Sequence, residues 1–139
     1  MPQKSLVLIL ARDLADKLAS AVFVVDHEGT LVYFNESAED ILGQSFPDVG
    51  PMRMEQWAAA FAPMELDGRP MQAHELPLVA ALQQLQPTHR TLRIQSMDRT
   101  VRDIAVTAFP LFAQSDELVG AMAIFWEHPP GASQTVEQG

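Results

Sequence analysis

Two stretches of this sequence are apolar at nearly every position, and they constrain the fold more than any other feature. They are AVFVVD at residues 21–26 and LVGAMAIFW at residues 118–126. A strand that is apolar on both faces needs cover on both faces, which places it in the middle of a sheet. Residues 88–95, THRTLRIQ, instead alternate apolar and polar side chains, a pattern typical of a strand at a sheet edge. The chain is therefore predicted to be an α+β domain whose sheet is covered on both faces.

Two further strands complete the predicted sheet. Residues 30–34, TLVYF, follow residues 21–26 across the turn DHEG, and a glycine in such a turn favours a β-hairpin. Residues 101–109, VRDIAVTAF, alternate and place Ile104 on the inner face. We therefore expect a five-stranded antiparallel sheet with the two apolar strands in its centre.

Short helices are predicted for one face of this sheet. Asn35 is a suitable N-cap for a helix over residues 36–42, and Gly43 suits its C-terminal end. Residues 75–85 predict a further helix with a proline in its first turn. Residues 54–61 predict a short helix within the irregular middle of the chain.

The N-terminal segment, residues 1–20, is predicted to contain an amphipathic helix over residues 4–20 that covers the other face of the sheet. Its apolar stripe ends at Leu18, and Leu8 and Ile9 lie outside it, so the first turns are apolar nearly all round. The other members of the stripe, which we expect to form a dimer and relay surface, are Leu6, Val7, Leu10 and Leu14. Periodicity alone leaves open whether the helix packs only on its own domain or also on a second subunit.

Charge and the lack of cysteine exclude several classes of function. Lys and Arg number 9 against 18 Asp and Glu, which gives a net charge of −9. Such a charge repels phosphate backbones and anionic lipids, so neither nucleic acid nor a membrane surface is an expected partner. With 0 cysteines, disulfides, thiolate zinc sites and cysteine nucleophiles are excluded. The apolar run at residues 6–11 is too short to span a bilayer or to serve as a signal peptide, so we expect a cytoplasmic protein.

Four groups of residues resemble the PAS sensor family in order and spacing. They are Val25-Asp26-x-x-Gly29; Phe34-Asn35-x-x-Ala38-x-x-x-Leu42-Gly43; Asp67-Gly68-x-Pro70 with Leu76-Pro77-Leu78 and Ala81-Leu82; and Thr107-Ala108-x-Pro110-Leu111 with Gly120. The resemblance covers about residues 18–127. It places the PAS domain at residues 21–127, between the N-terminal helix and a tail at residues 128–139 that is rich in Pro, Gly and Ser and is expected to be disordered.

The resemblance to PAS domains implies a signalling module with a sheet and helices around a small pocket, dimerising through its flanking helices. Some family members bind haem, flavin or a small organic ligand, and others recognise a signalling protein partner. Because the chain has no cysteine, photochemistry through a cysteine adduct is excluded, and flavin is not expected. Haem is not expected either, because the only histidine near the predicted pocket is a lone His74. The break after Trp126 disfavours output through a C-terminal helix, which leaves the N-terminal helix as the expected relay.

Catalysis and metal binding find no support in the sequence. His27, His74, His89 and His128 show no paired spacing typical of metal ligands, and a lone His74 before the 75–85 helix is a weak signal for haem. No serine stands in a G-x-S-x-G turn, and no glycine loop is suited to phosphate. We therefore expect a protein that is not an enzyme and holds no metal.

Trp57 and Phe61, spaced four residues apart on a short helix, form one apolar patch. They serve either as ordinary core or as the roof of a pocket. The remaining predicted wall residues are Leu78, Leu82, Leu92, Ile94 and Ile104. Such a lining favours an apolar or aromatic small molecule.

Three arginines near the edge strands, Arg90, Arg93 and Arg102, either meet a carboxylate at the mouth of this pocket or are simply solvated. The sequence thus predicts a sensory domain with an apolar ligand. The alternative is a ligand-free interaction module whose interior is filled by its own side chains.

Overall fold

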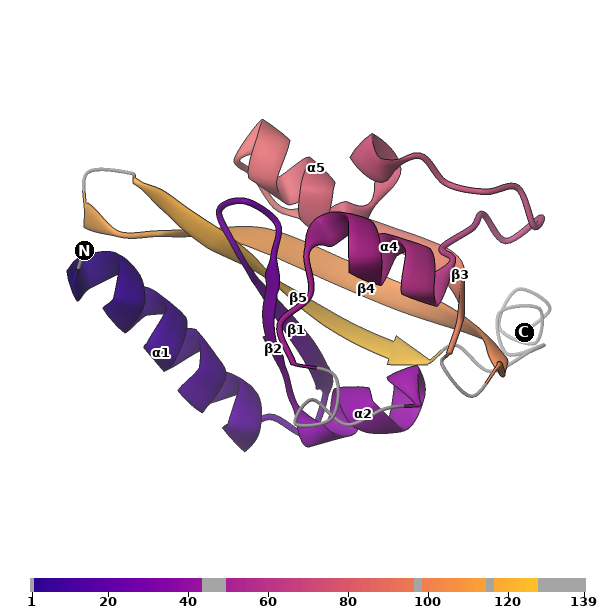
Figure 1. The fold of residues 1–139 in the computed structure, drawn as a ribbon, viewed down its shortest axis with the longest axis horizontal. Helices are drawn as coiled ribbons and strands as arrows, with labels where there is room; N and C mark the ends of the chain where they lie inside the picture. The colour runs from indigo at the N-terminus through magenta and orange to yellow at the C-terminus, as the bar shows by residue number, and fades with distance from the viewer. Residues whose placement is uncertain (1, 44–49, 97–98, 115–116, 128–139) are drawn as a thin grey trace, which may run out of the picture.

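A computed structural model describes residues 2–43, 50–96, 99–114 and 117–127. Five strands form one antiparallel sheet in the order β2-β1-β5-β4-β3 (Figure 1). The strands are β1 (Ala21–Asp26), β2 (Leu31–Phe34), β3 (Thr88–Gln95), β4 (Val101–Phe112) and β5 (Leu118–Glu127). The α+β prediction is confirmed, with β1 flanked by two neighbours and β3 at an edge. The predicted tail and His128 lie outside the described residues.

Helices cover both faces of the sheet, and each face has its own apolar core. The inner face carries α2 (Glu36–Leu42), α4 (Met54–Phe61) and α5 (Pro77–Gln84), and the other face carries α1 (Pro2–Lys17) (Figure 1). The alternation of each strand divides the two cores: Phe23 and Val25 point to the inner core, whereas Val22 and Val24 point toward α1. None of the described helices has both the length and the hydropathy needed to cross a bilayer.

The face of α1 that packs on the sheet is not the stripe of large residues expected from the sequence. Ala11 and Ala15 are buried, with Leu8 and Leu18 packed beside them. Small alanine side chains let the helix backbone lie close to the strands. Ala11 and Ala15 therefore face the sheet, although leucine side chains are more apolar. The helix also ends at Lys17, three residues earlier than predicted.

Two further departures from the predicted elements lie at prolines. The helix expected at residues 75–85 is split into a 3₁₀ turn, η1 (Ala73–Glu75), and α5, with Leu76 extended between them at ψ 135°. The residue before a proline disfavours helical angles, so Pro77 forces this break. Strand β4 runs three residues beyond the predicted end and passes through Pro110.

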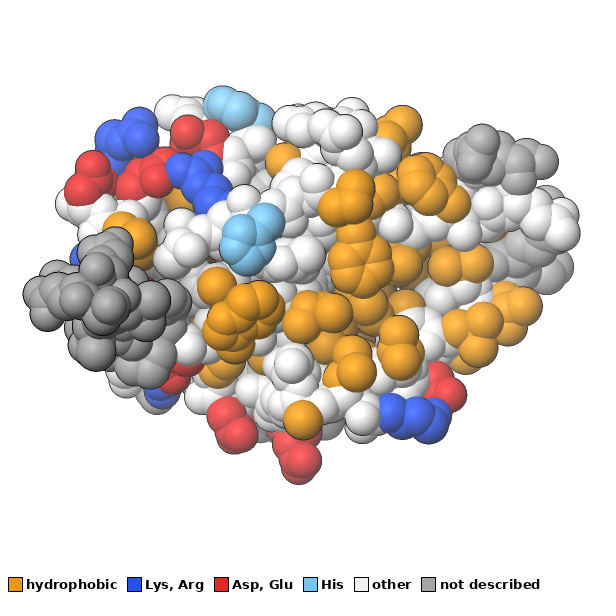
Figure 2. Space-filling view, turned by 180° about the vertical axis from the view of Figure 1, so that it is seen from behind, with side chains coloured by type: hydrophobic (Ala, Val, Ile, Leu, Met, Phe, Trp, Pro, Cys, Tyr) orange, Lys and Arg blue, Asp and Glu red, His pale blue; other side chains and the backbone are white. Residues whose placement is uncertain are grey.

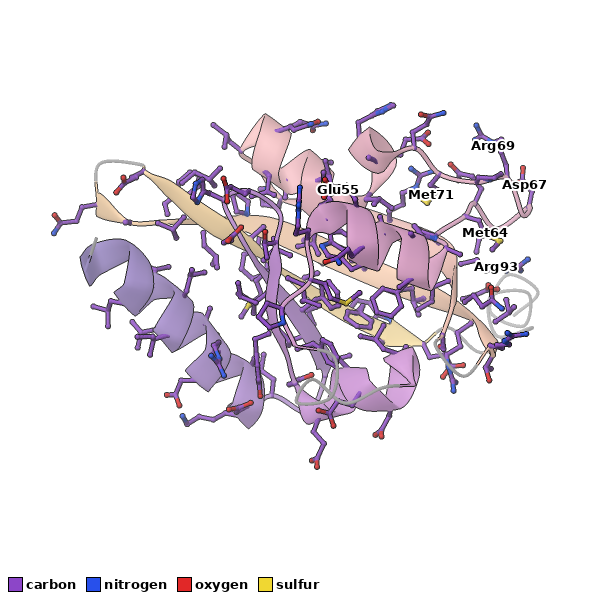
Figure 3. All side chains as sticks on the ribbon, in the orientation of Figure 1. Glu55, Met64, Asp67, Arg69, Met71 and Arg93 are labelled. Atoms are coloured by element: carbon purple, nitrogen blue, oxygen red, sulfur yellow. The ribbon has the colours of Figure 1, made fainter. Side chains whose placement is uncertain are left out.

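A strap formed by residues 63–71, for which the sequence predicts no regular element, closes part of the sheet edge at β3. The amide of Met64 donates to the carbonyl of Arg93, and the amide of Arg93 donates to the carbonyl of Met64, each at 2.8 Å. The strap folds back on itself at Gly68, and the Met71 amide bonds to the Pro63 carbonyl at 3.2 Å. Figure 3 shows Met64 beside Arg93, with Asp67 and Arg69 at the outer end of the strap.

Candidate ligand pocket

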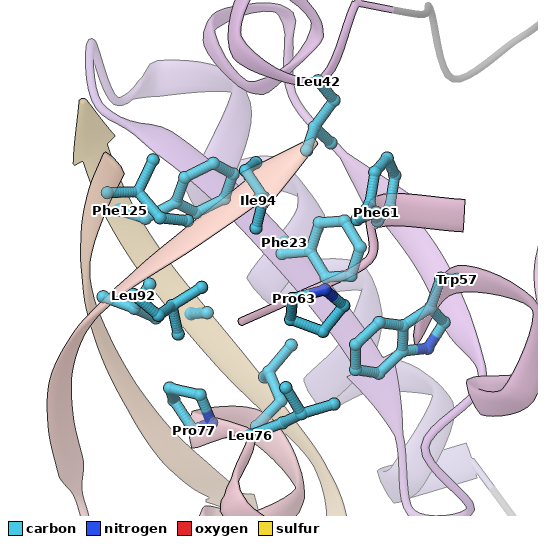
Figure 4. Close-up of a pocket in the computed structure, with 14 residues that line it drawn as sticks. Phe23, Leu42, Trp57, Phe61, Pro63, Leu76, Pro77, Leu92, Ile94 and Phe125 are labelled. Carbon is cyan, nitrogen blue, oxygen red and sulfur yellow. The ribbon is translucent and has the colours of Figure 1, made fainter. Parts of the chain in front are cut away.

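An apolar cavity lies between the inner face of the sheet, α4 and α5 (Figure 4). Six of the seven predicted wall residues surround it: Trp57, Phe61, Leu78, Leu92, Ile94 and Ile104. The seventh, Leu82, packs against the core but does not reach the cavity. Sequence reasoning missed the other wall residues, which are Phe23, Leu42, Pro63, Leu76, Pro77, Val106, Ala123 and Phe125.

Phe23 of β1 forms the back of the pocket and holds its aromatic wall together. Its ring stacks on Phe34 at 5.9 Å and meets Trp57 and Phe125 edge-on at 5.6 and 6.3 Å. The indole Nε1–H of Trp57 donates to the Gly29 carbonyl at 2.9 Å, so its polar atom is occupied away from the cavity. The wall therefore presents only apolar atoms.

The size of the cavity limits what it can hold. Its volume is about 80 Å³. One water needs roughly 10–15 Å³ on this measure, so the cavity has room for about five to eight water-sized groups. A benzene ring or a short hydrocarbon chain fits these limits. The wall has no partners for polar atoms, so a polar group placed in the cavity would lose its hydrogen bonds.

One charged pair lies at the rim of this pocket. Arg90 precedes Leu92 on the same face of β3, and its guanidinium binds the carboxylate of Glu65 on the strap. Its Nη1 also lies 3.4 Å from the carbonyl of Glu75, which directly precedes the wall residue Leu76. At the rim of the pocket, β3 thus contacts both the strap and η1 through Arg90.

The other two candidate arginines are also engaged by carboxylates of the chain. The Nε of Arg93 donates to Asp103 at 2.7 Å, and the pair raises the pKa of Arg93. Arg102 binds Glu127 at 3.1 Å. Both pairs join neighbouring strands within the sheet. Arg93 points to the outer face, whereas Arg102 shares the inner face of β4 with the wall residue Ile104, and neither arginine lines the pocket.

Asn35 connects the pocket side of the sheet to α1. Its side-chain oxygen accepts from the amides of Val22 and Ala38 at 2.9 and 3.0 Å. Its amide group donates to the carbonyls of Ala15 and Ser20 at 2.8 and 2.9 Å. All of these bonds are made by a side chain that is 2% exposed. The start of α2, the start of β1 and the end of α1 are therefore fixed to one another.

A second contact holds α1 against β2. The guanidinium of Arg12 lies 4.6 Å from the centre of the Tyr33 ring, and the Tyr33 hydroxyl donates to Asp16. Burial and this hydrogen bond to an anionic carboxylate raise the pKa of Tyr33 to about 12. One flank of α1 is thereby fastened to β2.

The opposite flank of α1 is exposed and apolar. Leu6, Leu10 and Leu14 form a ridge at four-residue spacing, and each is more than half exposed; Val7 beside them is partly buried. Trp126 and Phe112 are also exposed, near opposite ends of the β4–β5 pair. Figure 2 shows apolar side chains gathered on the side that is turned away in Figure 1.

Three of the four histidines lie within the described residues. His27 and His74 are exposed in a turn and in η1, and His89 on β3 bonds to the Thr107 hydroxyl at 2.8 Å. Among the residues that the structure describes, no three His, Asp or Glu side chains are grouped closely enough to hold a metal ion.

A family model for the PAS domain matches residues 19–127. The chain belongs to the PAS domain family. PAS domains are commonly sensory modules of signalling proteins and are generally non-catalytic. A search of curated protein sequences found no match.

Solved structures share the fold of this PAS domain at low sequence identity. The PAS domain of a Colwellia psychrerythraea protein is 16% identical with a TM-score of 0.64, over 88% of this chain and 97% of that one. The PAS domain of Bordetella pertussis BvgS is 17% identical with a TM-score of 0.60, over 94% and 93%. A Rhodobacter sphaeroides LOV protein is 14% identical with a TM-score of 0.66, over 91% and 70%. At these identities the likeness shows the fold alone.

Proposed function

We propose that this PAS domain is a non-catalytic sensor of the cytoplasm that takes a small apolar molecule into the cavity beneath α4 and α5. The observation that carries the proposal is the wholly apolar cavity of about 80 Å³ inside an otherwise packed core. Protein interiors are close-packed, so room for several atoms beside ordered aromatic rings is unusual in a domain that only has to fold. Its size and lining support a compact ligand rather than flavin or haem.

The ligand signal has a direct route to α1. Leu42 at the end of α2 and Phe23 on β1 both line the cavity. Both elements are joined through Asn35 to the carbonyl of Ala15 in α1. A ligand that fits better when these walls move outward shifts the population toward a second position of α1.

The output of this movement is the exposed ridge of α1. Leu6, Leu10 and Leu14 can pack against a second copy, as leucine ridges do when two helices associate. The expected partner is a homodimer mate, and a signalling protein would read the rearranged surface of that dimer.

A second candidate function is a ligand-free interaction module. The exposed ridge of α1 favours it, because leucines more than half exposed on one flank suit a protein interface whether or not the cavity is filled. In this alternative the domain dimerises and the cavity is only a packing defect.

Native mass spectrometry of freshly purified protein, with a denatured control, separates the two candidates. Extra mass that is lost on denaturation identifies a bound molecule and supports the receptor. A bare dimer favours the interaction module. A bare monomer contradicts the role given to α1.

A paired substitution tests α1 itself. Replacing Leu6 and Leu10 with Asp places charges on the ridge and should convert a dimer to a monomer, as measured by light scattering. Leu85→Asp is the matched control, because Leu85 is 52% exposed at the end of α5, away from the ridge. If the Leu6 and Leu10 double variant stays dimeric, α1 is not the interface.

A further inference from the structure

The rim pair, Arg90 and Glu65, gives the pocket a polar end. Arg90 shares the inner face of β3 with the wall residues Leu92 and Ile94 and is the next inward position along the strand. Its side chain is 33% exposed and that of Glu65 is 15% exposed. A half-buried guanidinium beside an apolar cavity is suited to bind an anion whose body lies in that cavity.

The position of the guanidinium follows from its contacts. It reaches Glu65, two residues after the wall residue Pro63, and the carbonyl of Glu75, one residue before the wall residue Leu76. The cation therefore stands between the strap and the start of α5, where two parts of the pocket wall meet.

Glu65 lies on a different kind of element from the other carboxylates that pair with arginine. Asp103 and Glu127 lie on β4 and β5, inside the sheet. Glu65 lies on the strap, which joins the sheet through the backbone of Met64 alone in the described bridges. The carboxylate on Arg90 can thus be exchanged without breaking a strand pairing.

Glu65 also has a second cation available. Arg69 on the same strap lies 3.2 Å from its carboxylate, and the Arg69 side chain is 65% exposed. When Glu65 leaves Arg90, it keeps this partner and is not left as an unpaired charge, so the exchange avoids the main penalty of breaking a partly buried pair.

We propose that the ligand is a small carboxylic acid with an apolar body, and that its carboxylate binds Arg90 in place of Glu65. This inference rests on the proposed function of the cavity and names the ligand class for it. In the absence of the acid, Glu65 fills the anion position and holds the strap closed against η1. Binding of the acid frees Glu65 from Arg90, while the backbone bonds of Met64 keep the strap on β3.

Two probes that differ only in charge test the proposal. Pentanoate and pentanamide have the same four-carbon tail, and only pentanoate can replace the Glu65 carboxylate. Calorimetric titration of the full chain is expected to show tighter binding of pentanoate. Hydrogen bonds to charged groups are worth about a tenfold to hundredfold change in affinity.

Substitutions of Glu65 and of Arg90 should change the affinity for pentanoate in opposite directions. Glu65→Gln removes the competing carboxylate and should tighten pentanoate binding by about tenfold, with pentanamide unchanged. Arg90→Gln should weaken pentanoate by at least about tenfold and leave pentanamide unchanged. A gain of affinity in the Glu65 variant cannot come from misfolding, so the test survives an unstable Arg90 variant.

Two control variants remove the same charges elsewhere. Arg93→Gln acts on the outward side of the same strand, and Glu55→Gln acts on α4, where the side chain is 70% exposed. Neither should alter the ratio of the two affinities. Equal binding of both probes, with no effect of Glu65→Gln, overturns the proposal and leaves an apolar receptor. Failure of both probes and of benzene to bind the wild-type protein overturns the proposed function itself.

Discussion

Two alanines on β5 offer a matched test of whether the cavity is unfilled by protein atoms in solution. Ala123 and Ala121 are two residues apart on the same inward face, and they are 2% and 0% exposed. Ala123 lines the cavity, whereas Ala121 lies within the inner core away from it. The same substitution, Ala to Val, therefore enters empty space at one position and packed atoms at the other.

The expected changes in stability have opposite signs. Ala123→Val adds two carbons to a cavity of about 80 Å³. Burying them is worth about 0.8 kcal/mol each, so the free energy of unfolding should rise by up to about 1.6 kcal/mol. Ala121→Val forces the same atoms into a close-packed core and should cost about 1–3 kcal/mol. The two variants should thus differ by about 1–5 kcal/mol, with Ala123→Val the more stable.

Urea unfolding followed by tryptophan fluorescence measures both values. Ala123→Val should also weaken benzene binding, because it removes part of the room that the ring needs. If both variants lose stability equally, the space beside Ala123 is filled in solution, and the argument for a ligand there is refuted.

Three further predictions concern the frame around the pocket. Asn35→Ala leaves the Val22 and Ala38 amides without their acceptor in a buried position, so urea unfolding should show a loss of at least about 2 kcal/mol. Folding raises the pKa of Tyr33 from 10.0 to about 12, so its contribution to stability is complete below pH 10 and is lost as the pH rises toward 12. Thermal melts from pH 9 to 12 should therefore fall more steeply for the wild type than for Tyr33→Phe, and equal slopes would contradict this assignment. Gly120→Ala would place a Cβ 2.2 Å from the Val25 carbonyl oxygen, so circular dichroism should show a large loss of stability, and a neutral effect would contradict the β1–β5 pairing.

The sheet could be predicted from the sequence because strand position and strand pattern are linked by burial. The fully apolar β1 and β5 had to be central, and the alternating β3 had to be an edge, which the observed strand order confirms. The orientation of α1 could not be predicted in the same way. Periodicity identifies an apolar stripe, but the close approach of Ala11 and Ala15 to the strands is decided by packing.

The pocket was only partly predictable for a related reason. Trp57, Leu92 and Ile94 lie on regular elements, whose period indicates which side faces inward. Pro63 and Leu76 reach the cavity from irregular segments. Such segments have no helix or strand periodicity that would indicate which side chains face inward. The pairing of Glu65 with Arg90 depends on a strap that joins β3 across 25 residues of sequence.

The central claim is that a small apolar molecule binds between the sheet, α4 and α5. A titration of methyl-labelled protein with benzene, followed by nuclear magnetic resonance, tests it most directly. The account predicts saturable one-to-one shifts that are largest at the methyl groups of Leu92, Ile94 and Ile104. Shifts that do not saturate, or that are largest at Leu10 and Leu14 on the exposed ridge of α1, would contradict it.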